Sequence, residues 1–290
     1  MTLDNDRQKG LWSLHGATLL FGATALFSHL IPLSALDITV IRCFIAAITL
    51  IILFRIQNNR LRLSSFKDYG VALLLGIIMG VHWFTYFAGM QLAGVAIGMI
   101  SFYTYPLMTV ILEPLLHRQL PHWSDLLLGV VGLVGLWLIA EGGKANPDVI
   151  SGIMTGVFSA LLFTLRNLLY RYKFSRYSGP QAMFYQTLVS AIILLPFLSD
   201  DWKGIEAKDW GNLVVLGIFF TALSHALYAT SLRYLKAKTV SLIACLQPFY
   251  STSLAIIVLS EIPTIQTVIG GCLIVSAAIY ETLYGHKRKS

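Results

Sequence analysis

The chain contains ten extended apolar runs, which are separated by short polar segments. A helix needs about 20 apolar residues to cross the hydrocarbon core of a bilayer. The short alternating segments of a membrane β-barrel are absent from the sequence. The pattern therefore predicts an all-α integral membrane protein whose ten transmembrane helices lie near residues 11–31, 35–55, 68–91, 94–116, 123–140, 151–170, 180–198, 210–232, 239–259 and 264–284.

The distribution of basic residues predicts how these helices are oriented. With ten spans both termini lie on one side, and the loops and termini of that side carry 16 Lys and Arg residues against 3 on the other. Cytoplasmic loops collect basic residues. We therefore expect a multi-pass protein of the plasma membrane, a bacterial inner membrane, with both termini cytoplasmic and basic loops beside anionic lipid. The basic residues are spread over short loops, so no nucleic-acid partner is expected.

Composition supports this class and narrows the chemistry. The chain of 290 residues is 56% hydrophobic and 12% charged, whereas soluble domains carry about 25% charged residues. The three cysteines, Cys43, Cys245 and Cys272, lie in apolar runs without metal-ligand spacing. We expect no metal and no cofactor.

The second half of the sequence repeats features of the first at a fixed offset. A shift of 142 residues, without a gap, superimposes five pairs of residues. Each half then holds five spans, and because five is odd the second half crosses the membrane in the opposite sense. This predicts two inverted five-helix repeats, residues 1–145 and 146–290, from the pairs Tyr86 and Tyr228, Pro106 and Pro248, Gln119 and Glu261, Pro121 and Pro263, and Gly129 and Gly271.

These residues carry a resemblance to a known family. The matching features are the spacing from tyrosine to proline in both halves, "SEIPT" at 260–264 and "IGG" at 269–271. With them the chain resembles the ten-helix EamA family of the drug/metabolite transporter superfamily. The resemblance implies a substrate cavity between the two halves and export of amino acids, related metabolites or drugs.

Polar and aromatic residues inside the spans are the candidates for that cavity. In "HWFTYF", residues 82–87, His82 and Tyr86 share a helix face. A polar face in a membrane helix is expected to face a cavity or another helix, since lipid leaves its polar atoms unpaired. Interhelical hydrogen bonding without any ligand is the competing interpretation. The predicted substrate-binding residues are His82, Tyr86, Tyr103, Tyr105, Arg166, His225, Tyr228 and Gln247.

Charged groups within the spans have two interpretations each. Arg166 either extends toward the cytoplasmic interface or pairs with an anionic substrate. Arg42 either extends outward toward the interface or binds a carboxylate or a backbone carbonyl, and the family resemblance favours a shared structural role. Glu113 either pairs with a basic loop residue or carries a coupling proton. We take Glu113 as the coupling candidate.

The predicted function is secondary active transport of a small organic solute by alternating access, with export favoured and protons as the expected coupling ion. Import or exchange of a quaternary amine or another metabolite stays open, as do uniport and a monomeric or homodimeric state. A receptor or scaffold, or an intramembrane lipid enzyme, is a less favoured class. No HExxH, GxSxG or GxxxxGK[ST] motif occurs, so we expect no enzyme.

Overall fold

The computed structural model describes residues 2–57, 61–116, 118–121, 123–142, 148–235 and 243–284. This part of the chain is helical and contains no strand. The helices are α1 (Thr2–Thr24), α2 (Phe27–Leu30), α3 (Ala35–Ile56), α4 (Phe66–Ala93), α5 (Val95–Phe102), α6 (Tyr105–Leu116), α7 (Trp123–Gly142), α8 (Asp148–Leu169), α9 (Gly179–Leu194), α10 (Ala207–Gly217), α11 (Ser224–Tyr234), α13 (Gln247–Leu259) and α14 (Ile265–Tyr284). Shorter π-helical and 3-10 turns are η1 (Tyr170–Phe174), η2 (Leu195–Phe197), η3 (Asp201–Gly204) and η4 (Ile218–Leu223).

The ten predicted spans are confirmed. Within the described ranges, seven segments are long and apolar enough to cross a membrane, and three shorter apolar helices occupy the fifth, ninth and tenth spans. The ninth span was predicted to begin at 239, and its first residues lie outside the described ranges. The boundary predicted between 1–145 and 146–290 also lies outside them.

Short polar residues and one glycine set the helix ends. The Ser34 hydroxyl accepts a hydrogen bond from the backbone amide of Asp37 at the start of α3, and Ser178 caps α9 in the same way. A tight turn between the predicted third and fourth spans forms at Gly94, whose φ is 84°. This left-handed conformation favours glycine and reverses the chain between α4 and α5.

The two proline-containing spans are interrupted at equivalent points. The fourth span breaks at residues 103–104, between α5 and α6, and the ninth has the same two-residue turn at 245–246, before α13. Pro106 and Pro248 fall in the first turns of the restarted helices, where a missing backbone N–H costs no hydrogen bond. The two spans are therefore broken just before these prolines.

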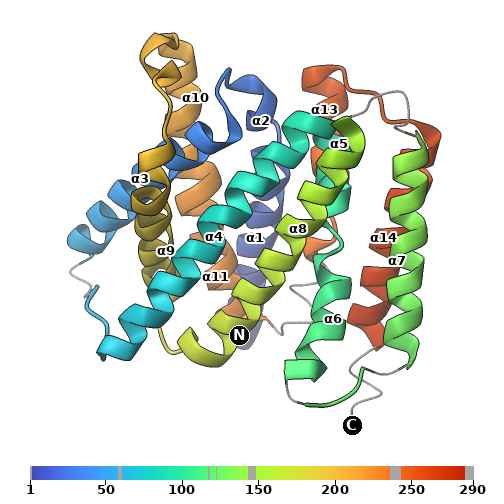
Figure 1. The fold of residues 1–290 in the computed structure, drawn as a ribbon. Helices are drawn as coiled ribbons and strands as arrows, with labels where there is room; N and C mark the ends of the chain where they lie inside the picture. The colour runs from blue at the N-terminus through green and yellow to red at the C-terminus, as the bar shows by residue number, and fades with distance from the viewer. Residues whose placement is uncertain are drawn as a thin grey trace.

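The two halves are related by an inversion. In Figure 1, α1 rises from the end of the bundle that holds the N-terminus, whereas its counterpart α8 descends toward that end. The helix contacts between the halves are related in the same way. Helix α4 of the first half packs against α8, and α11 of the second half packs against α1. The pairs α3 with α9 and α7 with α14 each join a helix to its own counterpart. The start of α1 and the end of α14 lie at the same end of the bundle (Figure 1).

The outer pair α7 and α14 packs through glycine. A Cβ atom added at Gly135 would lie 2.8 Å from the backbone oxygen of Gly270, which is closer than real Cβ contacts allow. Small residues permit such close helix approach in membranes. The glycine repeat at 129–135 therefore serves packing within the chain.

Candidate functional site: a cavity between the two halves

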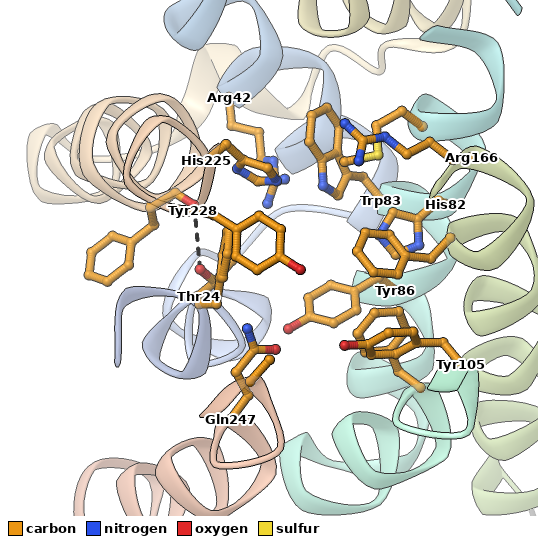
Figure 2. Close-up of a pocket in the computed structure, with 16 residues that line it drawn as sticks. Thr24, Arg42, His82, Trp83, Tyr86, Tyr105, Arg166, His225, Tyr228 and Gln247 are labelled. Atoms are coloured by element: carbon orange, nitrogen blue, oxygen red, sulfur yellow. Dashed lines mark hydrogen bonds between the residues drawn. The ribbon is translucent and has the colours of Figure 1, made fainter. Parts of the chain in front are cut away.

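A cavity opens where the helix interruptions of the two halves meet. Its free volume is about 80 Å³, which is smaller than the volume of about 300–1,000 Å³ that is usual for small-molecule sites. Its walls come from α1, α3, α4, α8, η4 and α11, and from the residues that flank the breaks in the fourth and ninth spans. Side chains from both halves project into it (Figure 2).

The lining of this cavity follows the internal repeat. Of its sixteen residues, twelve form six pairs that are each separated by 142 positions. A pair related by the offset places its members on opposite walls, one from each half. The cavity therefore lies between equivalent residues of the two halves. The pairs are Phe21 and Phe163, Thr24 and Arg166, Trp83 and His225, Tyr86 and Tyr228, Phe102 and Ala244, and Tyr105 and Gln247.

Seven of the eight predicted substrate-binding residues line the cavity; they are His82, Tyr86, Tyr105, Arg166, His225, Tyr228 and Gln247. Tyr103 does not line it. Its buried hydroxyl donates a hydrogen bond to the backbone carbonyl of Ala244 and lies 3.2 Å from Gln247 Oε1. Tyr103 thus joins the two helix breaks behind the cavity wall. The substrate-binding role of all eight residues stays a prediction.

Two histidines face the cavity with defined hydrogen-bonding roles. His82 Nδ1 lies 3.1 Å from the carbonyl oxygen and 2.8 Å from the hydroxyl of Ser159. His225 Nδ1 lies 2.8 Å from the carbonyl oxygen of Thr221. A carbonyl oxygen only accepts, so both Nδ1 atoms carry a proton. In the neutral ring Nε2 is then an acceptor, available to a ligand donor or to a proton.

Two arginines place positive charge in the cavity, and its lining contains no Asp or Glu. Arg166 is held by neutral partners: its Nε donates to Gln186 Oε1 at 2.7 Å and its Nη1 to Asn167 Oδ1 at 2.9 Å. Arg42 is 1% exposed, and its guanidinium carbon lies 4.6 Å from the centroid of the Trp83 ring.

The donors of Arg42 are only partly satisfied. Its Nε and Nη1 are buried without a hydrogen-bond partner in the described part of the chain. Cation–π contact in a desolvated site contributes about 2 kcal/mol, whereas removing an ion from water costs several kcal/mol. The ring contact therefore offsets only part of the cost of burying this charge.

Glu113, the predicted coupling residue, lies on α6 away from the cavity. Its carboxylate accepts a hydrogen bond of 2.6 Å from the Tyr172 hydroxyl and forms an ion pair of 3.1 Å with Arg171. This geometry matches the alternative in which Glu113 pairs with a basic loop residue, here Arg171 of η1, which follows α8. Its coupling role stays a prediction.

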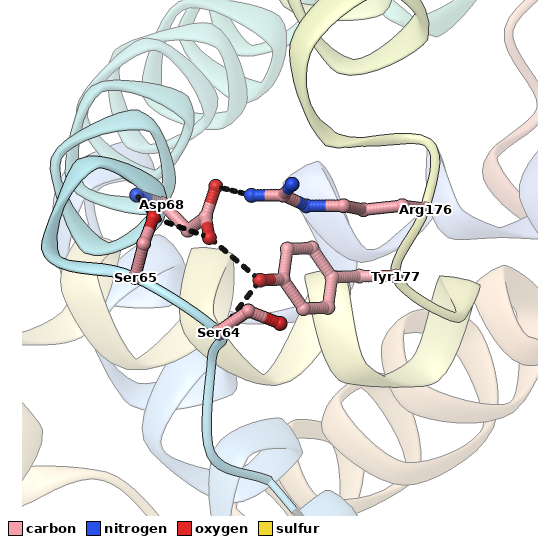
Figure 3. Close-up of polar contacts among 5 residues, drawn as sticks. All are labelled: Ser64, Ser65, Asp68, Arg176 and Tyr177. Atoms are coloured by element: carbon pink, nitrogen blue, oxygen red, sulfur yellow. Dashed lines mark hydrogen bonds and ion pairs between the residues drawn. The ribbon is translucent and has the colours of Figure 1, made fainter.

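A second polar cluster joins the halves at the end of the bundle that holds the termini (Figures 1 and 3). Asp68 at the start of α4 forms an ion pair with Arg176 and accepts hydrogen bonds from the Tyr177 and Ser65 hydroxyls at 2.8 and 2.7 Å. Tyr177 also accepts from the backbone amide of Ser64 at 2.8 Å. The hydrogen bond to Asp68 raises the pKa of Arg176. We call these five residues the terminal-side clamp.

Sequence reasoning missed several cavity residues. Arg42 was given a possible carboxylate-binding role but was not placed among the predicted substrate-binding residues, and it lines the cavity. Phe21 and Phe163 gave no polar signal, yet they are separated by the same 142 positions as Tyr86 and Tyr228. Applying the repeat offset to every aromatic position could have found them.

Comparison with known proteins agrees with this architecture. The sequence profile described as the EamA-like transporter family matches twice, over residues 8–140 and 150–281. An uncharacterized transporter YxxF of Bacillus subtilis is 24% identical over 237 residues, covering 79% of this chain and 75% of that protein. An S-adenosylmethionine uptake transporter of Rickettsia felis is 25% identical over 271 residues, covering 88% and 85%. One solved crystal structure superimposes with a TM-score of 0.67 over 99% of both chains at 18% identity, and so shares the fold.

Proposed function

Because the chain belongs to the EamA-like transporter family, we propose that it is a secondary active transporter that moves a small organic solute through the central cavity by alternating access. The observation that carries this proposal is the pairing of cavity residues across the two inverted halves. Two similar halves of opposite sense can exchange conformations, which opens one site to each side of the membrane in turn.

The substrate class that we favour is an amino acid or a related metabolite, with export as the leading direction. Aromatic rings surround the cavity and can stack on an apolar body, while the arginine and histidine side chains supply directional polar contacts. A drug is the other substrate class that the family resemblance implies.

Import is the second candidate, and the names of relatives favour it. The Rickettsia felis relative and another from Rickettsia conorii, 24% identical over 270 residues, are described as S-adenosylmethionine uptake transporters. Exchange follows from the same mechanism. A quaternary amine is a weaker candidate, because two arginines and no carboxylate line the cavity.

The membrane environment is also part of the proposal. We place the protein in the plasma membrane with both termini cytoplasmic, since 16 basic residues fall on the side of the termini and 3 on the other. The terminal-side clamp would then close the cytoplasmic end. Protons are the proposed coupling ion, either through a cavity histidine or through Glu113, and the protein acts as a monomer or a homodimer in membrane lipid.

The test is solute flux in sealed vesicles that contain the purified protein. Vesicles are loaded with single amino acids, S-adenosylmethionine or related metabolites, and counterflow of each labelled solute is measured. Counterflow that is lost in Tyr86→Ala and kept in Tyr250→Phe, a change outside the cavity, supports the proposal. Ligand binding without flux of any bound solute would instead indicate a receptor.

A further inference from the structure

Arg42 is the charged group of the cavity whose surroundings are least complete. It is 1% exposed, and its Nε and Nη1 have no hydrogen-bond partner in the described part of the chain. The aromatic faces of Trp83 and Phe87, at 4.6 and 5.0 Å from the guanidinium carbon, accept no conventional hydrogen bond. Buried polar groups are otherwise almost always paired, so an acceptor is missing from this site.

The neighbouring Cys43 thiol is a side-chain hydrogen-bond partner of Arg42, and sulfur is a weak acceptor. The ionisable groups on the other cavity walls are Arg166, His82, His225 and tyrosines, and no carboxylate faces Arg42 from any of the elements that line the cavity. In Figure 2 the guanidinium group lies beside His225 and Trp83 and extends toward the open centre. The missing acceptor would therefore come from a molecule in the cavity.

From this geometry we propose that the cavity receives solutes carrying a carboxylate, with Arg42 binding the carboxylate and the aromatic wall of Trp83, Tyr105 and Phe163 packing against an apolar body. The inference rests on the proposed function and names its substrate class. A guanidinium is matched to carboxylate in charge and donor geometry. Arg166, already bound to Gln186 and Asn167, adds positive potential without needing to touch the ligand.

The closing experiment measures thermal stabilisation of the purified full-length protein by matched probe pairs. The probes are phenylacetate, indole-3-acetate, phenylalanine and tryptophan, each compared with its primary amide, together with sodium sulfate at equal ionic strength. At least one carboxylate is expected to bind wild type more tightly than its amide by about tenfold or more, as for hydrogen bonds to a charged group.

Two variants connect that preference to Arg42. Arg42→Gln is expected to remove the preference for carboxylate over amide, whereas Arg55→Gln, an exposed arginine of the same helix, keeps it. Arg42→Met separates a binding role from a structural one: loss of an unpaired buried charge is expected to leave the melting temperature of the empty protein unchanged or higher, and an arginine needed for packing would lower it.

Three results would overturn the assignment. They are equal stabilisation by every acid and its amide, an unchanged preference in Arg42→Gln, and sulfate stabilising as well as the carboxylates, which would indicate a general anion site.

Vesicle flux is measured independently of ligand binding. Flux of a neutral solute that survives Arg42→Gln refutes the carboxylate assignment and leaves transport intact. Carboxylate binding that depends on Arg42 without flux refutes transport.

Discussion

The hydroxyl of Tyr103, in the break of the fourth span, donates a hydrogen bond to the backbone carbonyl of Ala244, which directly precedes the corresponding break of the ninth span. The interruption of the fourth span therefore touches the interruption of the ninth. Because Phe102, Tyr105, Ala244 and Gln247 flank these breaks and line the cavity, movement of either break changes the cavity walls.

Tyr103→Phe removes this connection and keeps the ring. A neutral hydrogen bond contributes about 1 kcal/mol, which corresponds to a loss of about 2–4 °C in melting temperature for a domain of 150–250 residues. We expect a faster or slower transport cycle with little change in ligand affinity, because Tyr103 lies outside the cavity lining. Tyr250→Phe is the control, since its hydroxyl has no partner among the described residues. A large loss of affinity in Tyr103→Phe would mean that the hydroxyl contacts the solute.

Asp68→Asn is expected to weaken the terminal-side clamp. The change removes the ion pair with Arg176, whose raised pKa keeps it charged throughout any practical assay range. We expect the cavity to spend more time open toward the side of the termini, which is measured as faster labelling of a cavity cysteine from that side. Lys203→Gln breaks an exposed ion pair with Asp200 at 2.6 Å and serves as the matched control. Equal labelling rates in Asp68→Asn and wild type would show that the clamp does not limit access.

Glu113→Gln separates proton coupling from binding. Its carboxylate lies outside the cavity and is held by Arg171 and Tyr172, so ligand affinity is expected to stay within about twofold of wild type, a change under 1 kcal/mol. If Glu113 carries the coupling proton, the variant loses accumulation driven by a pH gradient and keeps counterflow. Retained pH-driven accumulation assigns coupling elsewhere, with His82 and His225 as the remaining cavity candidates.

Gly135→Ala tests the close packing of α7 on α14. The added Cβ would meet the backbone of Gly270 at 2.8 Å, and overpacking of this kind costs about 1–3 kcal/mol. Gly211→Ala is the control on another helix, where nothing lies within 4 Å of the added atom, and it should be neutral or slightly stabilising. Similar melting temperatures for the two variants would show that the helices can separate without cost.

Much of this fold could be predicted because a chain that crosses the bilayer must satisfy its backbone hydrogen bonds internally, which favours long apolar helices. Apolar length fixed the ten spans, and the 142-residue offset fixed the inverted halves. The positions of the helix breaks were harder to predict, because the turns at 103–104 and 245–246 depend on contacts across the halves, such as that of Tyr103. The role of Arg42 could not be predicted from the sequence either, because only the three-dimensional surroundings show that its Nε and Nη1 lack a hydrogen-bond partner.

Alternating access through the central cavity is tested most directly by a single cysteine at Thr24, which lines the cavity. Cys43, Cys245 and Cys272 are first replaced by serine, and Thr24→Cys is then exposed to a membrane-impermeant thiol reagent from each side of sealed vesicles. We predict labelling from both sides, inhibition of flux by either treatment, and protection by a transported solute. Labelling from neither side, or full flux after complete labelling, would contradict a transport path between the two halves.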